Sequence, residues 1–160
     1  MGKVFNLPEL KTQIKFWRAA GKKIVFTNGC FDLLHRGHVE YLGVAKSYGD
    51  ILIIGLNSDS SVRRLKGAGR PFTNEQDRSY ILAHLLMVDA VCLFDEDTPF
   101  TIISEVQPDV LVKGGDYKLH EIVGKDVVEQ WGGKVVTVAV VKDKSTSVLI
   151  DNIRKVNQVS

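Results

Sequence analysis

Short, continuously apolar runs alternate along the chain with longer segments whose apolar positions recur at helical spacing. The runs are rich in β-branched residues and cover residues 23–27, 51–56, 90–94, 110–113 and 134–141. A strand that is apolar at every position, rather than at every second one, is typical of a parallel sheet covered on both faces. The pattern therefore predicts five buried parallel strands.

Helices are expected between these runs. A first helix should precede the first run, because Leu10, Ile14 and Trp17 share one face there. Further helices are expected at 38–48, 74–86, 98–106, 125–131 and 145–156. Strand and helix thus alternate about five times, which predicts an α/β fold: a Rossmann-like, doubly wound parallel five-stranded sheet with helices on both faces.

No internal repeat and no Pro-, Gly- or Ser-rich linker interrupts the 160 residues, whose number suits one domain with a single core. We expect one domain, 1–160, in which 1–22 form an N-terminal helical extension. Ligands of such folds bind beyond the carboxyl ends of the strands. The candidate binding loops are therefore 28–37, 57–70, 113–117 and 142–147.

Composition narrows the function classes. The net charge is only +2, and Lys and Arg are scattered along the chain, which argues against a general nucleic-acid or membrane-surface binder. No apolar run approaches the ~20 residues that span a bilayer, and the first residues lack the pattern of a signal peptide. Two cysteines, Cys30 and Cys92, are too few for a disulfide framework or a zinc cage. We expect a soluble cytoplasmic protein.

The segment after the first run, TNGCFDLLHRGH at 27–38, carries the clearest candidate chemistry. It lacks the G-x-G-x-x-G of a dinucleotide site, and the chain has no G-x-x-x-x-G-K-[ST] phosphate loop. His35 and His38 can lie on the same side of a first helical turn, and Gly37 lets a phosphate approach the backbone. Free N–H groups at a helix start favour an anion. The segment therefore predicts a polyphosphate site, although a ligand-free pair of helix-start histidines is the plainer alternative.

This stretch resembles the H-x-G-H signature of the nucleotidyltransferase superfamily, and KSTS at 144–147 resembles its second signature. The resemblance runs from about residue 23 to 156. Within the superfamily, RLKGAGRP, DEDTP and LVKGGDY resemble the adenylyltransferases that form ADP-heptose. The resemblance implies transfer of AMP from ATP to D-glycero-β-D-manno-heptose 1-phosphate, with release of pyrophosphate, for lipopolysaccharide core or surface polysaccharide synthesis. It also implies the stand-alone form, because 160 residues are too few for the sugar kinase of bifunctional relatives.

The same resemblance implies roles for individual residues. The catalytic residues would be His35, His38 and Lys66, acting on the phosphates and the charge that develops on them. The nucleotide would further contact Cys30, Phe31, Gly37, Lys113, Gly114, Asp116, Ser145 and Thr146. The sugar phosphate would contact Asp32, Lys66, Arg70 and Arg78. No residue is assigned to a metal, since Mg²⁺ would be carried mainly by ATP, and relatives of this type imply a homo-oligomer, a dimer or tetramer.

Alternatives remain both for the roles of single residues and for the function of the whole protein. Asp32 and Asp116 could stabilise their loops, Arg70 could fix a turn, and Ser145 could cap a helix. A cytidylyltransferase acting on glycerol 3-phosphate or a related polyol phosphate is the second enzyme reading, although Val140 stands where its R-T-E-G-I-S-T-T motif has arginine. A nucleotide-binding regulatory module without turnover is the third.

Overall fold

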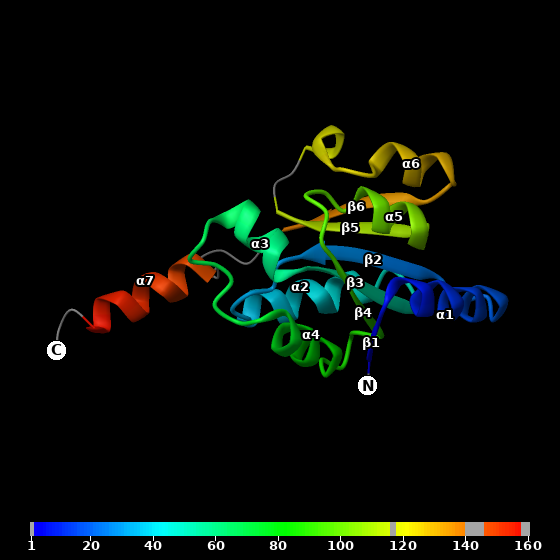
Figure 1. Cartoon of the computed structure of the whole chain (residues 1–160). Helices are drawn as coiled ribbons and strands as arrows, with labels where there is room; N and C mark the ends of the chain where they lie inside the picture. The colour runs from blue at the N-terminus through cyan, green and yellow to red at the C-terminus, as the bar shows by residue number, and fades with distance from the viewer. Residues whose placement is uncertain (1, 116–117, 140–145, 158–160) are drawn as a thin grey trace.

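The computed structural model describes residues 2–115, 118–139 and 146–157, and within them six strands form one all-parallel sheet (Figure 1). The strands are β1 (Lys3–Phe5), β2 (Ile24–Gly29), β3 (Ile51–Asn57), β4 (Ala90–Phe94), β5 (Val110–Gly114) and β6 (Lys134–Val138). Their order across the sheet is β1-β4-β3-β2-β5-β6. The chain therefore builds the sheet outwards from β2 in one direction and then crosses to the other side of β2.

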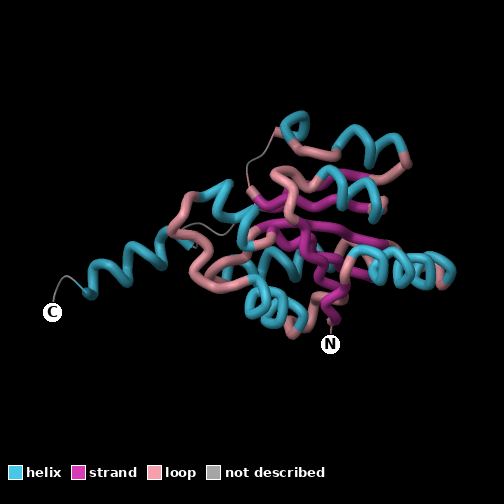
Figure 2. The backbone as a smooth tube through the Cα atoms, viewed as in Figure 1, coloured by secondary structure: helices cyan, strands magenta, loops and turns pink. Residues whose placement is uncertain are grey.

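Seven α-helices and one 3₁₀ turn are described. They are α1 (Leu7–Ala19), α2 (Arg36–Lys46), α3 (Asp59–Lys66), α4 (Glu75–Ala83), α5 (Phe100–Val106), α6 (Lys125–Gln130), α7 (Thr146–Asn157) and the turn η1 (Leu119–Glu121). Helices lie on both faces of the sheet, and α7 runs away from its carboxyl edge (Figures 1 and 2). No helix among the described residues has the length and apolar character needed to cross a bilayer.

Two apolar cores lie on opposite faces of the sheet, because neighbouring residues of a strand point to opposite sides. Phe26 and Ile53 join the core under α1, α5 and α6. Val25 and Leu52 join the core under α2 and α4. All of these side chains have no exposed surface. The predicted doubly wound fold with strands covered on both faces is thus confirmed.

The prediction of five strands was one short, and residues 1–22 are not purely helical. Lys3–Phe5 pair in parallel with β4 as an edge strand, and α1 buries Leu10 and Ile14 in the first core. The edge strand was missed because it has three residues and two of them are exposed.

The segment 57–70 was expected to be a loop but contains α3. Ser58 caps this helix by accepting a hydrogen bond from the Ser61 backbone N–H. Only Ser61 and Val62 of this eight-residue helix are buried, so its apolar positions are too few for a sequence pattern to distinguish it from a loop. The helix matters to function because its last residue is Lys66.

Candidate active site

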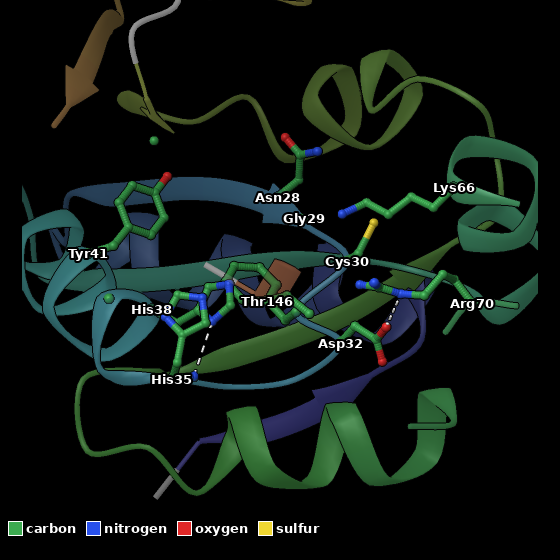
Figure 3. Close-up of a pocket in the computed structure, with 13 residues that line it drawn as sticks. Asn28, Gly29, Cys30, Asp32, His35, His38, Tyr41, Lys66, Arg70 and Thr146 are labelled. Atoms are coloured by element: carbon green, nitrogen blue, oxygen red, sulfur yellow. Dashed lines mark hydrogen bonds and ion pairs between the residues drawn. The ribbon is translucent and has the colours of Figure 1, made fainter. Parts of the chain in front are cut away.

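A cavity of about 560 Å³ opens at the carboxyl ends of β2 and β5, where the strand order changes direction (Figure 3). Crevices at this position are the usual ligand sites of doubly wound sheets. The cavity is lined by Asn28, Gly29, Cys30, Phe31, Asp32, His35, Gly37, His38, Tyr41, Lys66, Arg70, Gly114 and Thr146. These residues come from β2 and the loop after it, the first part of α2, the end of α3 and the loop after it, the end of β5 and the start of α7.

The two imidazoles form a stacked pair at the start of α2. His35 is the N-cap residue, and its ring centroid lies 3.9 Å from that of His38, with 30° between the planes. The backbone N–H of His35 donates to Nδ1 of His38 at 3.4 Å, and the Phe31 ring packs against His38 with 5.4 Å between centroids. The predicted placement of both histidines on one side of the first turn is therefore correct.

His38 is a neutral donor at neutral pH. Burial, helped by the nearby His35 and Lys66, lowers the pKa of His38 to about 4. A neutral imidazole carries one proton, and Nδ1 accepts the bond from His35, so the proton resides on Nε2. Nε2–H is then the group that His38 can offer to a phosphate oxygen.

Two cations, Lys66 and Arg70, reach the cavity from the end of α3 and the loop that follows. Lys66 is exposed and ends the helix, and Gly67 stops it with φ of 95°. Arg70 Nε bonds Asp32 Oδ2 at 2.6 Å, and Asp32 Oδ1 accepts the backbone N–H groups of Phe72 and Thr73 at 2.7 and 3.0 Å. Asp32 therefore anchors this segment over the cavity.

The opposite wall is formed where β2 and β5 end. Tyr41 Oη is 2.6 Å from Thr27 Oγ1 and donates to the Val112 carbonyl at 3.2 Å, which fixes its ring beside Gly114. A Cβ on Gly114 would lie 3.0 Å from Cε2 of that ring, so glycine is what lets β5 pass there. Lys113 does not line the cavity; its Nζ donates to Oδ1 of Asn28.

Arg78 lies behind the cavity rather than on its wall. Its side chain has no exposed surface. It donates to the carbonyls of Thr73 at 2.9 Å, Cys30 at 2.6 Å and Asn57 at 2.9 Å, and to Asp59 Oδ1 at 2.7 Å. Since these bonds occupy its guanidinium, we assign Arg78 to holding the ends of two strands rather than to binding substrate.

The structure thus brings most of the sequence-predicted residues to one cavity. These are Cys30, Phe31, Asp32, His35, Gly37, His38, Lys66, Arg70, Gly114 and Thr146. Lys113 and Arg78 lie outside its lining, and Asp116 and Ser145 lie outside the described residues. The sequence reasoning placed Asn28 and Gly29 in the candidate binding loop 28–37 but assigned them no role, and it missed Tyr41, which follows His38 by three positions. For the residues that were assigned a role from the sequence, contact with a ligand stays a prediction.

The described residues offer no site for a metal ion of the protein's own. They contain no group of three or more His, Cys, Asp and Glu that could hold one. Asp32 contributes the one carboxylate found in the described cavity lining, and both its oxygens already accept bonds from Arg70, Phe72 and Thr73. The described lining therefore leaves no carboxylate oxygen free for Mg²⁺, which takes oxygen ligands.

Comparison with known proteins gives a consistent family. The model of the cytidylyltransferase-like family matches residues 26–159. The bifunctional protein HldE of Geotalea uraniireducens (strain Rf4) is 56% identical over 152 residues, and that of Geobacter metallireducens (strain ATCC 53774 / DSM 7210 / GS-15) is 58% identical over 151. These matches cover 95% and 94% of this chain but 31% of each relative. The chain therefore spans about a third of the length of the curated relatives it matches.

Solved structures agree. The lipopolysaccharide core biosynthesis protein from Thermoplasma volcanium GSS1 superposes with a TM-score of 0.63 at 32% identity, covering 76% of this chain and 98% of that one. Pantoate-beta-alanine ligase from Francisella tularensis superposes with a TM-score of 0.66 over 92% of this chain and 69% of its own, and at 14% identity it supports the fold alone. With its family match, its parallel sheet and its paired imidazoles at the start of α2, the chain belongs to the cytidylyltransferase-like family of nucleotidyltransferases.

Proposed function

We propose that the protein is an adenylyltransferase that moves AMP from ATP to D-glycero-β-D-manno-heptose 1-phosphate, giving ADP-heptose and pyrophosphate. The observation that carries the proposal is the stacked pair of His35 and His38 facing the same cavity as Lys66 and Arg70. The neutral N–H of His38 and the cations Lys66 and Arg70, converging on one cavity, suit a triphosphate whose charge shifts during transfer.

The reaction needs alignment more than acid–base chemistry. A phosphate oxygen of the sugar phosphate, already ionised at neutral pH, attacks the α-phosphorus of ATP. The bond from that phosphorus to the oxygen bridging to the β-phosphate breaks, and pyrophosphate leaves with the electron pair. Nε2–H of His38 is suited to an α-phosphate oxygen, while Lys66 and Arg70 are suited to the charge that grows on the leaving group.

Magnesium enters this proposal with the substrate. A triphosphate supplies most of the oxygen ligands that Mg²⁺ needs, and the engaged carboxylate of Asp32 leaves the protein little part in holding the ion. The protein's own cations would then complement the ion rather than replace it.

Support for the sugar comes from sequence. RLKGAGRP, DEDTP and LVKGGDY resemble the ADP-heptose-forming enzymes. The HldE relatives are more than half identical over nearly the whole chain. The name of the Thermoplasma volcanium protein agrees with a role in lipopolysaccharide core synthesis. We further propose that the enzyme works in the cytoplasm as a homo-oligomer, a dimer or tetramer, which light scattering on the purified protein would test.

Pyrophosphate release tests the function. ATP and CTP are each paired with heptose 1-phosphate and with glycerol 3-phosphate, and the ATP and heptose 1-phosphate pair should give the highest kcat/KM. Preference for CTP with glycerol 3-phosphate would make the enzyme a cytidylyltransferase of polyol phosphates. No release with any pair would refute catalysis and leave a nucleotide-binding module.

A further inference from the structure

We propose that Asn28 is a further binding residue of the site, and that its amide N–H₂ group, aimed by Lys113, binds the phosphorylated acceptor rather than the nucleotide. The inference rests on the proposed function, because it names what one wall of the same cavity recognises. Asn28 lies in the candidate binding loop 28–37, but the sequence assigned it no role, and Lys113 was expected to contact the nucleotide itself.

The orientation of the Asn28 amide follows from chemistry. Lys113 Nζ contacts the side-chain oxygen of Asn28, and an ammonium group has hydrogens to donate but no lone pair to accept with. The amide oxygen must therefore face Lys113, and the amide nitrogen must face away from it. Since Asn28 lines the cavity and Lys113 does not, the two N–H donors are left for the cavity.

The lysine behind the amide makes this wall attractive to an anion. Lys113 is partly buried at the end of β5, and burial lowers the pKa of its ammonium to about 8. Among the described residues, no carboxylate forms an ion pair with it. The positive charge polarises the Asn28 amide, which strengthens its N–H groups as donors.

Position in the cavity favours the acceptor. Figure 3 shows Lys66 reaching from α3 towards the end of β2 that carries Asn28, while His35 and His38 lie together at the start of α2. The imidazole end can take the α-phosphate through the neutral Nε2–H of His38. The wall with Asn28, which has Lys113 behind it, offers positive charge and hydrogen-bond donors to a second phosphate with hydroxyl groups around it. This is the chemistry of a sugar phosphate.

The experiment separates acceptor from nucleotide. KM for heptose 1-phosphate is measured by pyrophosphate release, and Kd for a non-hydrolysable ATP analogue is measured by calorimetry. Asn28→Ala and Asn28→Asp should raise the acceptor KM about ten-fold or more and leave the analogue Kd within about two-fold. Asn28→Asp retains the contact with Lys113 but has no N–H to donate, so its thermal stability should not fall. An unchanged acceptor KM, or weakened analogue binding instead, overturns the proposal.

The role of Lys113 as a positioning residue has its own test. Lys113→Met should reproduce the rise in acceptor KM, Lys113→Arg should restore most of the affinity because it keeps a donor, and Lys113→Met combined with Asn28→Ala should be no worse than either single change. Lys46→Met, which removes a partly buried lysine paired with Asp89, is the control for general destabilisation. Additive effects of the Asn28 and Lys113 changes would show that Lys113 does not act through Asn28.

Failure of the proposed function would be distinguishable from failure of this inference. If the wild-type protein releases no pyrophosphate with any pair, binding of heptose 1-phosphate is followed by calorimetry in the same variants. Binding to wild type that Asn28→Ala abolishes supports the inference. Equal binding by both, or no binding by wild type, overturns it.

Discussion

Replacing Arg78 with methionine should destabilise the fold more than any change at an exposed arginine. The guanidinium ties the carbonyls at the ends of β2 and β3, Cys30 and Asn57, to the segment before α4 at Thr73 and to Asp59 at the start of α3. Methionine replaces the aliphatic part of the arginine side chain but has no hydrogen-bond donor. Three carbonyls and one carboxylate would then have to find water or move.

The size of the effect follows from these contacts. Removing one partner of a buried ion pair typically costs about 3–5 kcal/mol, because the other charge stays buried and unpaired. The Asp59 side chain is 21% exposed, so water can partly replace its lost partner and the cost should be near the low end, about 3 kcal/mol. For a domain of this size about 1 kcal/mol corresponds to about 2–4 °C in Tm. We therefore expect Tm to fall by roughly 10 °C.

Urea unfolding followed by circular dichroism measures the free energy, and thermal unfolding measures Tm. Arg64→Met is the matched control, since Arg64 lies on α3 and is 44% exposed in its ion pair with Asp97. Such surface pairs contribute about 0–1 kcal/mol. If Arg78→Met unfolds within about 1 kcal/mol of wild type, as the control should, the view of Arg78 as the tie between the two strand ends is refuted.

Four further outcomes are expected around the cavity. His38→Ala should lower kcat by about 10²–10³-fold. His84→Ala is the control, since this exposed ring is bonded to its own helix, and it should leave kcat unchanged. Equal losses of kcat in the two variants would contradict the assignment of His38 to catalysis. Burial lowers the pKa of His38 from 6.5 to about 4, so the unfolded state binds this proton more readily. Tm should therefore fall as pH drops from about 6.5 to 4, and His38→Gln should flatten that slope. Lys66→Ala should weaken binding of an ATP analogue about ten-fold, whereas Lys11→Ala, whose lysine pairs with Glu105 across the surface, should not. Burial raises the pKa of Cys30 above its usual 9, so iodoacetamide should alkylate this thiol slowly at pH 7 and faster above pH 9. Bound nucleotide should protect the thiol from alkylation. If saturating ATP gives no protection, the nucleotide binds elsewhere.

The parts of the fold that sequence could predict are those set by burial. β3 is buried at every position, and such a strand has no alternative to a sheet with two covered faces. β1 and α3 escaped prediction because their stability comes from neighbours. β1 pairs with β4, and α3 is tied at its first residue, Asp59, to the buried Arg78 of α4.

The residues of the candidate site also divide into those that the sequence could place and those that it could not. His35 and His38 could be placed from the sequence because they share one helical turn. Asn28 and Lys113 are 85 positions apart and meet only because β2 and β5 are neighbours in the sheet. The place of Arg78 behind the cavity could not be foreseen, because the three backbone carbonyls and the Asp59 carboxylate that accept its hydrogen bonds come together only in the fold.

The shortest of the described strands, β1, closes one edge of the sheet. β1 covers the backbone N–H and C=O groups along the outer side of β4, from Ala90 to Cys92. Bare strand edges of this kind recruit strands from other chains. A protein shortened to begin at Leu7 would keep the cavity, which lies at the carboxyl ends of β2 and β5. It would, however, present an open apolar strand edge, and it should form assemblies larger than the dimer or tetramer that we propose for the full chain.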